Sequence, residues 1–177
     1  MTTSALKQTD KSAPSSDLDA IAMLKSDHKK VTELFDKFEK TREGGSSKEK
    51  GSLIIENGSE LLIHTAIEEH IFYPTVSRKI KDDDLLNEAL VEPAGAKNLI
   101  HQLESMCPDV KMFDAKVTVL GEYIRHRVKE QQDEIFKKVR KTNIDLEALG
   151  SKMLKLKKKL MEHGDSPSQP KRASAKG

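Results

Sequence analysis

Cysteine, aromatic residues and long apolar runs are all scarce in this chain, and each absence excludes a class of protein. The single cysteine, Cys107, cannot form a disulfide within the chain, so nothing in the sequence points to an oxidising compartment. No apolar run reaches the roughly 18 residues that a membrane-spanning helix needs. The first residues, MTTSALKQTDKSAPSSD, lack the apolar core of a secretory signal peptide. We therefore expect a cytoplasmic protein without a membrane span.

Tryptophan is also absent, and aromatic residues make up only 4% of the 177 residues, whereas charged residues make up 34%. A composition this rich in Lys, Glu and Leu favours an all-α protein over a β-sandwich. The formal net charge of +2 is too small to indicate nucleic acid as a partner. The sequence contains no Gly-rich phosphate loop, and Cys107 has no context that suggests an activated thiol, so the motifs give no support to an enzyme.

Five helical patterns lie between two polar ends. Residues 1–16 and 164–177 are rich in Ser, Lys and Pro, which predicts a disordered leader and a disordered basic tail. Residues 17–142 hold four long amphipathic patterns joined by short links, which predict an antiparallel up-down-up-down four-helix bundle. Residues 143–163 predict an appended amphipathic helix. We expect its apolar side to pack on the bundle, with membrane or partner binding as the alternative.

Capping and breaking residues indicate where the helices begin and end. Ser16 or Asp17 is expected to cap the first helix, and the REGGSSKEK segment is expected to end it at the glycines and to cap the next at a serine. Pro74 is expected to kink or end the second helix. The third helix is expected to begin at the acidic residues 82–84. The Cys-Pro-Asp segment at 107–109 is expected to end the third helix and to cap the fourth.

Each of the four long patterns has one apolar row, and polar or helix-breaking residues interrupt every row near its middle. Burying an unpaired polar group costs about 1–3 kcal/mol, so interruptions in all four rows are hard to explain as ordinary core polarity, and in the first half of the chain they favour a metal-site origin. The rows are Ile21, Leu24, His28, Val31, Phe35 and Phe38; Ile54, Asn57, Leu61, His64, Glu68, Ile71 and Thr75; Leu86, Ala89, Pro93, Ala96, Ile100 and Leu103; and Val110, Phe113, Val117, Leu120, Ile124, Arg127 and Gln131.

The second row carries the clearest metal-binding spacing. His64 and Glu68 stand one helical turn apart, so an imidazole and a carboxylate share one face of the helix. Carboxylate-bridged metal sites in bundle cores are built from residues at such spacings.

Three segments, SDHKKVTELF, HTAIEEHIFYP and GEYIRHRVKEQQDEIF, resemble the hemerythrin-like, or HHE cation-binding, domain family over roughly residues 18–162. The resemblance implies a bundle in which each of two helix pairs supplies one histidine from its first helix and a His-x-x-x-Glu pair from its second, holding two irons. It also implies a non-haem site that binds or senses oxygen, iron or nitric oxide. By this resemblance His28, His64 and Glu68 stand at family ligand positions, and Glu68 is the bridging carboxylate.

The second half of the chain departs from the family pattern. Pro93, Arg127 and Gln131 stand where the resemblance implies histidine, histidine and glutamate. Arginine has no lone pair for a metal, a glutamine carbonyl is a weak neutral ligand, and proline offers no ligand and removes a backbone hydrogen bond. Gly95 makes a helix break at 92–95 plausible. We therefore predict that a di-iron site is absent.

Nearby polar residues do not replace the missing ligands. His126 is adjacent to position 127 but points about 100° away around the helix. His101 lies about 12 Å from Pro93 along the helix axis, too far from the other histidines. Glu69 and His70 flank the second row, where solvated or indirect roles are expected.

Two alternatives remain for the centre. In the first, Arg127 supplies the positive charge that iron would supply and pairs with Glu68 in a bidentate manner, and Gln131 completes the hydrogen bonds. In a simpler version of this metal-free centre, Arg127 reaches solvent and Glu68 is hydrated. In the second, His28, His64 and Glu68 bind one ion, since two imidazoles and a carboxylate are ligands of non-haem iron and of some zinc sites.

The overall expectation is a divergent, non-catalytic family member with a structural or regulatory role and no cofactor. The alternative is a protein that handles oxygen, iron or redox chemistry with one non-haem iron or another divalent metal. The partners left open are an unknown protein and a second copy of this chain, and neither a membrane nor nucleic acid is expected.

Overall fold

Helices account for all regular structure in residues 19–163, the part of the chain that the computed structural model describes. The predicted leader, 1–16, and tail, 164–177, lie outside these residues. In chain order the elements are α1 (Ala20–Thr41), α2 (Ser47–Ile67), a π-helical turn (Glu68–Phe72), α3 (Tyr73–Val76), α4 (Asp83–Val91), α5 (Pro93–Glu104), α6 (Lys111–Glu130), a second π-helical turn (Gln131–Ile135), α7 (Phe136–Arg140) and α8 (Leu146–His163).

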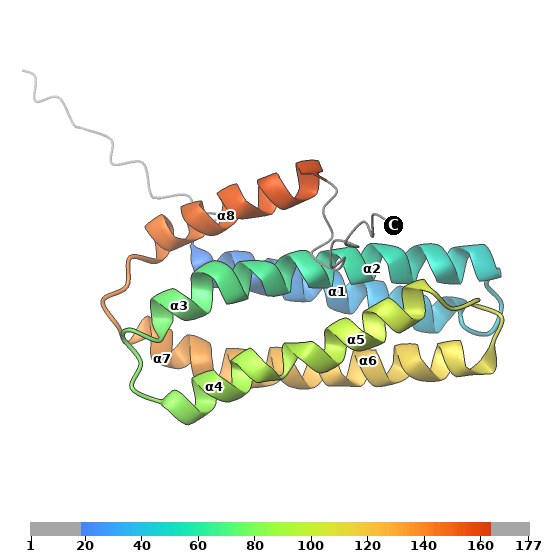
Figure 1. Ribbon diagram of the computed structural model, residues 1–177, viewed down its shortest axis with the longest axis horizontal. Coiled ribbons are helices and arrows are strands. Elements are labelled where there is room, and N and C mark those ends of the chain that lie inside the picture. Colours follow the sequence, from blue (N-terminus) through green and yellow to red (C-terminus); the bar gives the residue numbers. More distant parts are fainter. Residues whose placement is uncertain (1–18, 164–177) are drawn as a thin grey trace, which may run out of the picture.

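Four helical rods lie side by side in the body of the molecule (Figure 1). The first is α1, the second is α2 continued into α3, the third is α4 followed by α5, and the fourth is α6 continued into α7. α1 packs on α2, α2 on α5, α5 on α6, and α6 on α1. This arrangement confirms the predicted all-α, four-helix bundle. Among the described residues, no helix combines the length and the apolar character needed to cross a membrane.

The first two helix starts follow local capping rules. The N-cap of α1 is Asp19, whose carboxylate accepts from the backbone N–H groups of Ile21 at 2.8 Å and Ala22 at 3.0 Å. The predicted cap at Ser16 or Asp17 is therefore wrong, because the helix begins at Ala20. Ser46 caps α2 in a reciprocal capping box with Glu49, as the REGGSSKEK segment predicts.

The start of α6 differs from the prediction. The helix begins at Lys111, and its N-cap residue Val110 provides no side-chain hydrogen bond. The Asp109 carboxylate, expected to cap this helix, instead accepts a hydrogen bond from the Ser47 hydroxyl at the start of α2. The contact joins the loop before α6 to the start of α2.

The third rod is broken at Glu92, within the segment where a break was expected. Glu92 both ends α4 and precedes α5, and Pro93 is the first residue of α5. At that position the missing N–H of proline would have no partner within the helix, so the usual penalty for a mid-helix proline is avoided. The Tyr123 hydroxyl of α6 donates to the Glu92 carbonyl and fixes this break to the neighbouring rod.

Two π-helical turns begin at equivalent places in the second and fourth rods. Glu68 and Gln131, which are 63 residues apart, each begin one of these turns. In each turn the carbonyl of this first residue accepts a hydrogen bond from the N–H group of the residue five positions later. The extra residue advances the buried face by one position, so Phe72 and Val76 are buried where Ile71 and Thr75 were predicted. Pro74 does not end the helix, which continues to Val76.

The core consists of two apolar clusters with a polar layer between them. One cluster joins the start of α1 to α3, α4, α7 and α8, and includes Phe72, Phe136 and Met153. The other joins the opposite ends of α1, α2, α5 and α6, and includes Phe38 and Phe113. The buried polar layer between them contains Asp27, His28, His64, Glu68 and Gln131.

The appended helix α8 folds back onto α1 and α2 (Figure 1). Its residues Leu149 and Met153 are buried in the first apolar cluster, and Leu146 and Leu156 pack against that cluster. The predicted packing of the fifth helix on the bundle is confirmed.

Candidate metal centre

The three predicted ligands of the first half-site meet in the polar layer. His28 comes from α1, His64 from α2, and Glu68 is the first residue of the following π turn. Their exposed fractions are 5%, 8% and 2%. All three continue the apolar rows of their helices, so packing of those rows draws the polar side chains inward with their neighbours.

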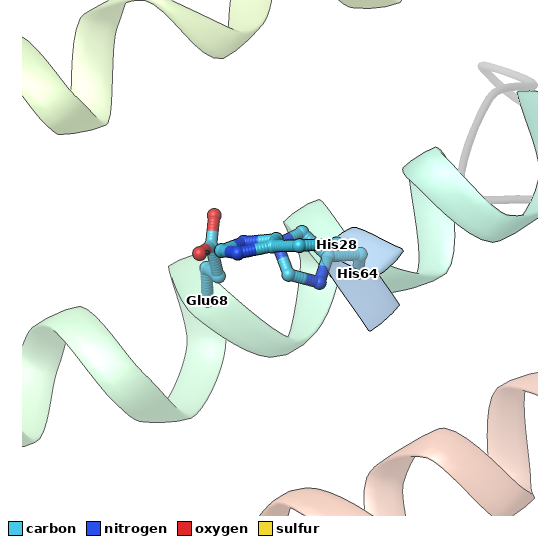
Figure 2. Close-up of side chains that lie close together, drawn as sticks. All are labelled: His28, His64 and Glu68. Carbon is cyan, nitrogen blue, oxygen red and sulfur yellow. Dashed lines mark ion pairs between the residues drawn. The ribbon is translucent and has the colours of Figure 1, made fainter. Parts of the chain in front are cut away.

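The side chains are close enough to share one ion. Figure 2 shows both imidazoles gathered beside the Glu68 carboxylate. One ligand atom from each residue lies within 4.8 Å of the other two. The imidazole centroids are 4.9 Å apart, and His64 Nε2 lies 3.2 Å from Glu68 Oε1.

Glu68 also has partners from the second half of the chain. The Gln131 amide donates to Oε1, and Arg127 Nη2 donates to Oε2 over 3.4 Å. The predicted pairing of Arg127 with Glu68, supported by Gln131, is therefore present. The bidentate form is wrong, because the other terminal nitrogen, Nη1, lies 3.4 Å from the Ala89 carbonyl and 3.7 Å from Glu92 Oε2. Only 13% of the Arg127 side chain is exposed, so the alternative in which it reaches solvent is also wrong.

The centre contains a carboxylate, that of Asp27, which the sequence did not predict. Asp27 Oδ2 lies 3.5 Å from His64 Nδ1, which is within ion-pair distance but outside good hydrogen-bond geometry. Its other oxygen accepts a hydrogen bond from Lys157 of α8. The spacing Leu24, Asp27, Val31 would have placed Asp27 on the inward face of α1, but no local pattern could identify its partner 130 residues away.

The buried charges shift the two histidines in opposite directions. Burial lowers the pKa of His64, but the carboxylates of Glu68 and Asp27 outweigh it and raise this pKa to about 9. Burial, assisted by the positive charge of His64, lowers the pKa of His28 to about 3. At neutral pH His64 is therefore cationic and His28 is neutral. The neutral His28 ring can accept at Nδ1 from the Gln132 amide nitrogen, 3.3 Å away.

Glu68 remains ionised in this setting. Burial raises the pKa of its carboxyl, but His64 and then Arg127 lower it, and the net result is a pKa of about 2. The charged groups in contact are the cations His64, Arg127 and Lys157, and the anions Asp27, Glu68 and Glu92. The positive and negative charges of this network are equal in number without a metal.

A small cavity of about 30 Å³ lies within the polar layer, lined by His28, His64, Glu68, Arg127 and Gln131 among others. This volume suits one water molecule or one ion. The residues do not fit a pair of irons, because two imidazoles and one carboxylate are too few ligands for two ions and the Arg127 guanidinium lies against that carboxylate. His28, His64 and Glu68 do fit a single divalent ion, for which they offer two nitrogens and one oxygen.

The other polar residues considered in the sequence lie outside this centre. His70 and His126 are exposed. His101 lies beside Glu104, with 3.4 Å between Nδ1 and Oε2. Glu69 pairs with Lys97, whose Nζ lies 2.7 Å from Oε1. None of these four reaches the polar layer, as the helix geometry predicted.

Comparison with known proteins points to one family. The family model described as the hemerythrin HHE cation binding domain matches residues 19–139. No curated protein matches the chain. Among solved structures, a hemerythrin HHE cation binding domain-containing protein, the Rv2633c homolog from Mycobacterium kansasii, is similar, with a TM-score of 0.67 and 21% identity over 85% of this chain and 94% of that one. At this identity the likeness is one of fold.

Proposed function

This chain belongs to the hemerythrin HHE cation-binding domain family, and from that premise we propose that it is a divergent member without a di-iron centre. Its role is structural or regulatory rather than catalytic. In the middle of the bundle, the positive and negative side chains of the polar layer balance one another without a metal. We place the protein in the cytoplasm, on the grounds of its single cysteine.

The proposal rests on one observation, that both carboxylate oxygens of Glu68 accept hydrogen bonds from protein side chains. Gln131 and Arg127, which stand at two of the family's ligand positions, donate to the two carboxylate oxygens. A cation close to Arg127 would be repelled: at an effective dielectric constant of about 20, two unit charges about 4 Å apart repel by about 4 kcal/mol. Two divalent ions would multiply that cost and would also upset the equal charges of the metal-free network.

Optical spectroscopy of a restored site tests the proposal. An oxo-bridged di-iron centre has charge-transfer absorption, whereas a metal-free bundle is colourless. We expect the wild type, loaded anaerobically with ferrous iron and then exposed to air, to stay colourless. The variant Pro93→His/Arg127→His/Gln131→Glu, which restores the family residues, should gain the absorption. Charge-transfer bands in the wild type that match those of the restored variant would refute the proposal.

A second candidate function is the binding of one divalent metal by His28, His64 and Glu68. It is favoured by the close approach of these three ligand atoms and by the carboxylate of Asp27 behind His64. A carboxylate in that place orients a ligating imidazole and raises its basicity. Bound non-haem iron would supply oxygen or redox chemistry. The chain would provide the ligands and Asp27 as the positioning group, and His64 would lose its proton to expose a lone pair.

Calorimetric titration of the metal-free protein with ferrous iron under anaerobic conditions tests this candidate. Binding at His28, His64 and Glu68 should be lost in His64→Ala and kept in the control His70→Ala, which removes an exposed histidine of the same helical rod. Equal binding by the two variants would exclude His64 as a ligand.

A further inference from the structure

A second group of ligand-type side chains lies at the break between α4 and α5, outside the polar layer. It consists of Glu92, His126 and Glu130. Glu92 is the residue at the break, while His126 and Glu130 stand one turn apart on α6. His126 is exposed and the two glutamates are half-buried, so the group opens to solvent. One ligand atom from each residue lies within 4.8 Å of the other two.

The backbone around the group is held in place by contacts that do not involve its ligand atoms. The Tyr123 hydroxyl binds the Glu92 carbonyl, which fixes the break against α6. Pro93 restricts the chain directly after Glu92. His126 and Glu130 share a face of a regular helix because they are four residues apart. Small rotations of three side chains would bring their ligand atoms to metal-binding separations.

Within the described residues, neither the His126 imidazole nor the Glu130 carboxylate has a hydrogen-bond partner or an ion pair. Partial burial, and then the negative charges of Glu92 and Glu88, raise the pKa of Glu130, while His126 acts in the opposite direction. A cation held between the Glu92 and Glu130 carboxylates would relieve the repulsion between them.

We propose that Glu92, His126 and Glu130 form a solvent-facing site for one divalent transition-metal ion of the zinc class. One imidazole nitrogen and two carboxylate oxygens form a ligand set that zinc accepts, with water as the fourth ligand. Binding requires no change in oxidation state. The ion would fasten the α4–α5 break to α6, on the outside of the bundle and apart from His28, His64 and Glu68.

Arg127 is the cation that competes for Glu92. Its Nη1 lies 3.7 Å from Glu92 Oε2, which is longer than a hydrogen bond. The same guanidinium also contacts Glu68 and the Ala89 carbonyl, so it keeps partners when Glu92 turns toward a metal. Glu92 can therefore turn to the metal site without leaving Arg127 unpaired, and solvent at the exposed His126 side screens the ion from the guanidinium more than the buried layer would.

Calorimetric titration of the full chain with zinc chloride, after removal of metals with a chelator, tests the site. We expect His126→Ala to weaken zinc binding at one site by at least about tenfold, since loss of even an indirect metal contact often costs 10- to 100-fold. Glu130→Gln should have a similar effect with little change in shape. The matched control is His101→Ala, because His101 also lies beside a glutamate but has no third ligand.

Equal zinc affinity in the wild type and in His126→Ala would overturn the proposal, as would an equal loss in His101→Ala. Nuclear magnetic resonance of the wild type provides a test without substitution. Zinc at the proposed site should shift the ring signals of His126 and leave those of His101 unchanged. A shift confined to His28 and His64 would instead assign the ion to the polar layer and refute this site. A shift of the His126 signals supports the site whether or not the polar layer also binds metal.

Discussion

At the scale of single residues, the centre is organised around Glu68. The residue is 2% exposed and receives hydrogen bonds or ion pairs from His64, Arg127 and Gln131. A carboxylate buried this deeply stays ionised only when cations and donors surround it. Removing one of those partners should therefore lower the free energy of unfolding more than removing an exposed charge does.

Arg127→Met isolates the contribution of the guanidinium. We expect a loss of about 3–5 kcal/mol in the free energy of unfolding of the metal-free protein, because Glu68 stays buried after losing a cation. Urea denaturation followed by circular dichroism gives the value. The control is Arg125→Met on the same helix. The Arg125 side chain is 44% exposed and pairs with Asp36, so its loss should change stability by less than about 1 kcal/mol. An Arg127→Met variant as stable as the wild type would mean that Arg127 does not hold the charge of Glu68.

The opposite pKa shifts of the two histidines predict a stability maximum near pH 6.5 in the metal-free protein. Burial lowers the pKa of His64, but Glu68 and Asp27 outweigh it and raise this pKa to about 9, so the contribution of His64 to stability is complete below pH 6.5 and is lost as pH rises through 9. The pKa of His28 is lowered to about 3, so stability also falls as pH drops from 6.5 toward 3.

Denaturation series from pH 4.5 to 9.5 measure both limbs of this profile. We expect the free energy of unfolding to fall by on the order of 2 kcal/mol on each side of the maximum. His28→Gln should flatten the acidic limb, and His64→Gln should flatten the alkaline limb. A profile that rises steadily through pH 9, or one that neither variant changes, would show that the two histidines do not titrate as a shifted pair.

At the scale of elements, the sequence predicts which residues are buried as far as the π turns and not beyond them. The rows of α1, α2, α5 and α6 follow the α-helical period, so their buried residues were predicted as far as Glu68 and Gln131. Beyond those residues the period changes, and the buried positions in the second rod move from Ile71 and Thr75 to Phe72 and Val76. A rule based on 3.6 residues per turn cannot anticipate an inserted residue.

The same limit applies to α8. Its apolar side was recognised, but the contact of Lys157 with Asp27 depends on where the helix folds back. Asp27 touches His64, so α8 reaches the polar layer through two side chains. The helix is therefore part of the environment of the centre rather than an independent attachment.

Lys157→Met should destabilise the protein by about 1–3 kcal/mol, because Asp27 would keep its buried charge and lose a donor. Amide hydrogen exchange should increase in α8 at the same time. Lys158→Met replaces the adjacent exposed lysine and serves as the control. Equal stability and equal exchange in the two variants would show that the Lys157–Asp27 contact does not hold α8 in place.

At the scale of the whole molecule, the polar layer divides one long bundle into two apolar clusters. The sequence located this layer, because polar residues interrupt the first, second and fourth rows and Pro93 interrupts the third. It could not reveal that the charges there balance, since Asp27, Lys157 and Glu92 lie outside the family positions. The ligand positions are local features of the sequence, whereas the charge balance is a property of the folded chain.

The central claim is that this bundle has no di-iron pair, and the iron content per chain tests it most directly. The protein would be loaded anaerobically with ferrous iron, desalted and measured by mass spectrometry. Wild type, His64→Ala and His126→Ala would be compared, so that iron at the outer group of Glu92, His126 and Glu130 is recognised by its loss in the third protein. One iron that only His64→Ala removes would favour the second candidate function. We expect no iron in the polar layer, and two irons per chain that survive His126→Ala would show that a di-iron pair forms there.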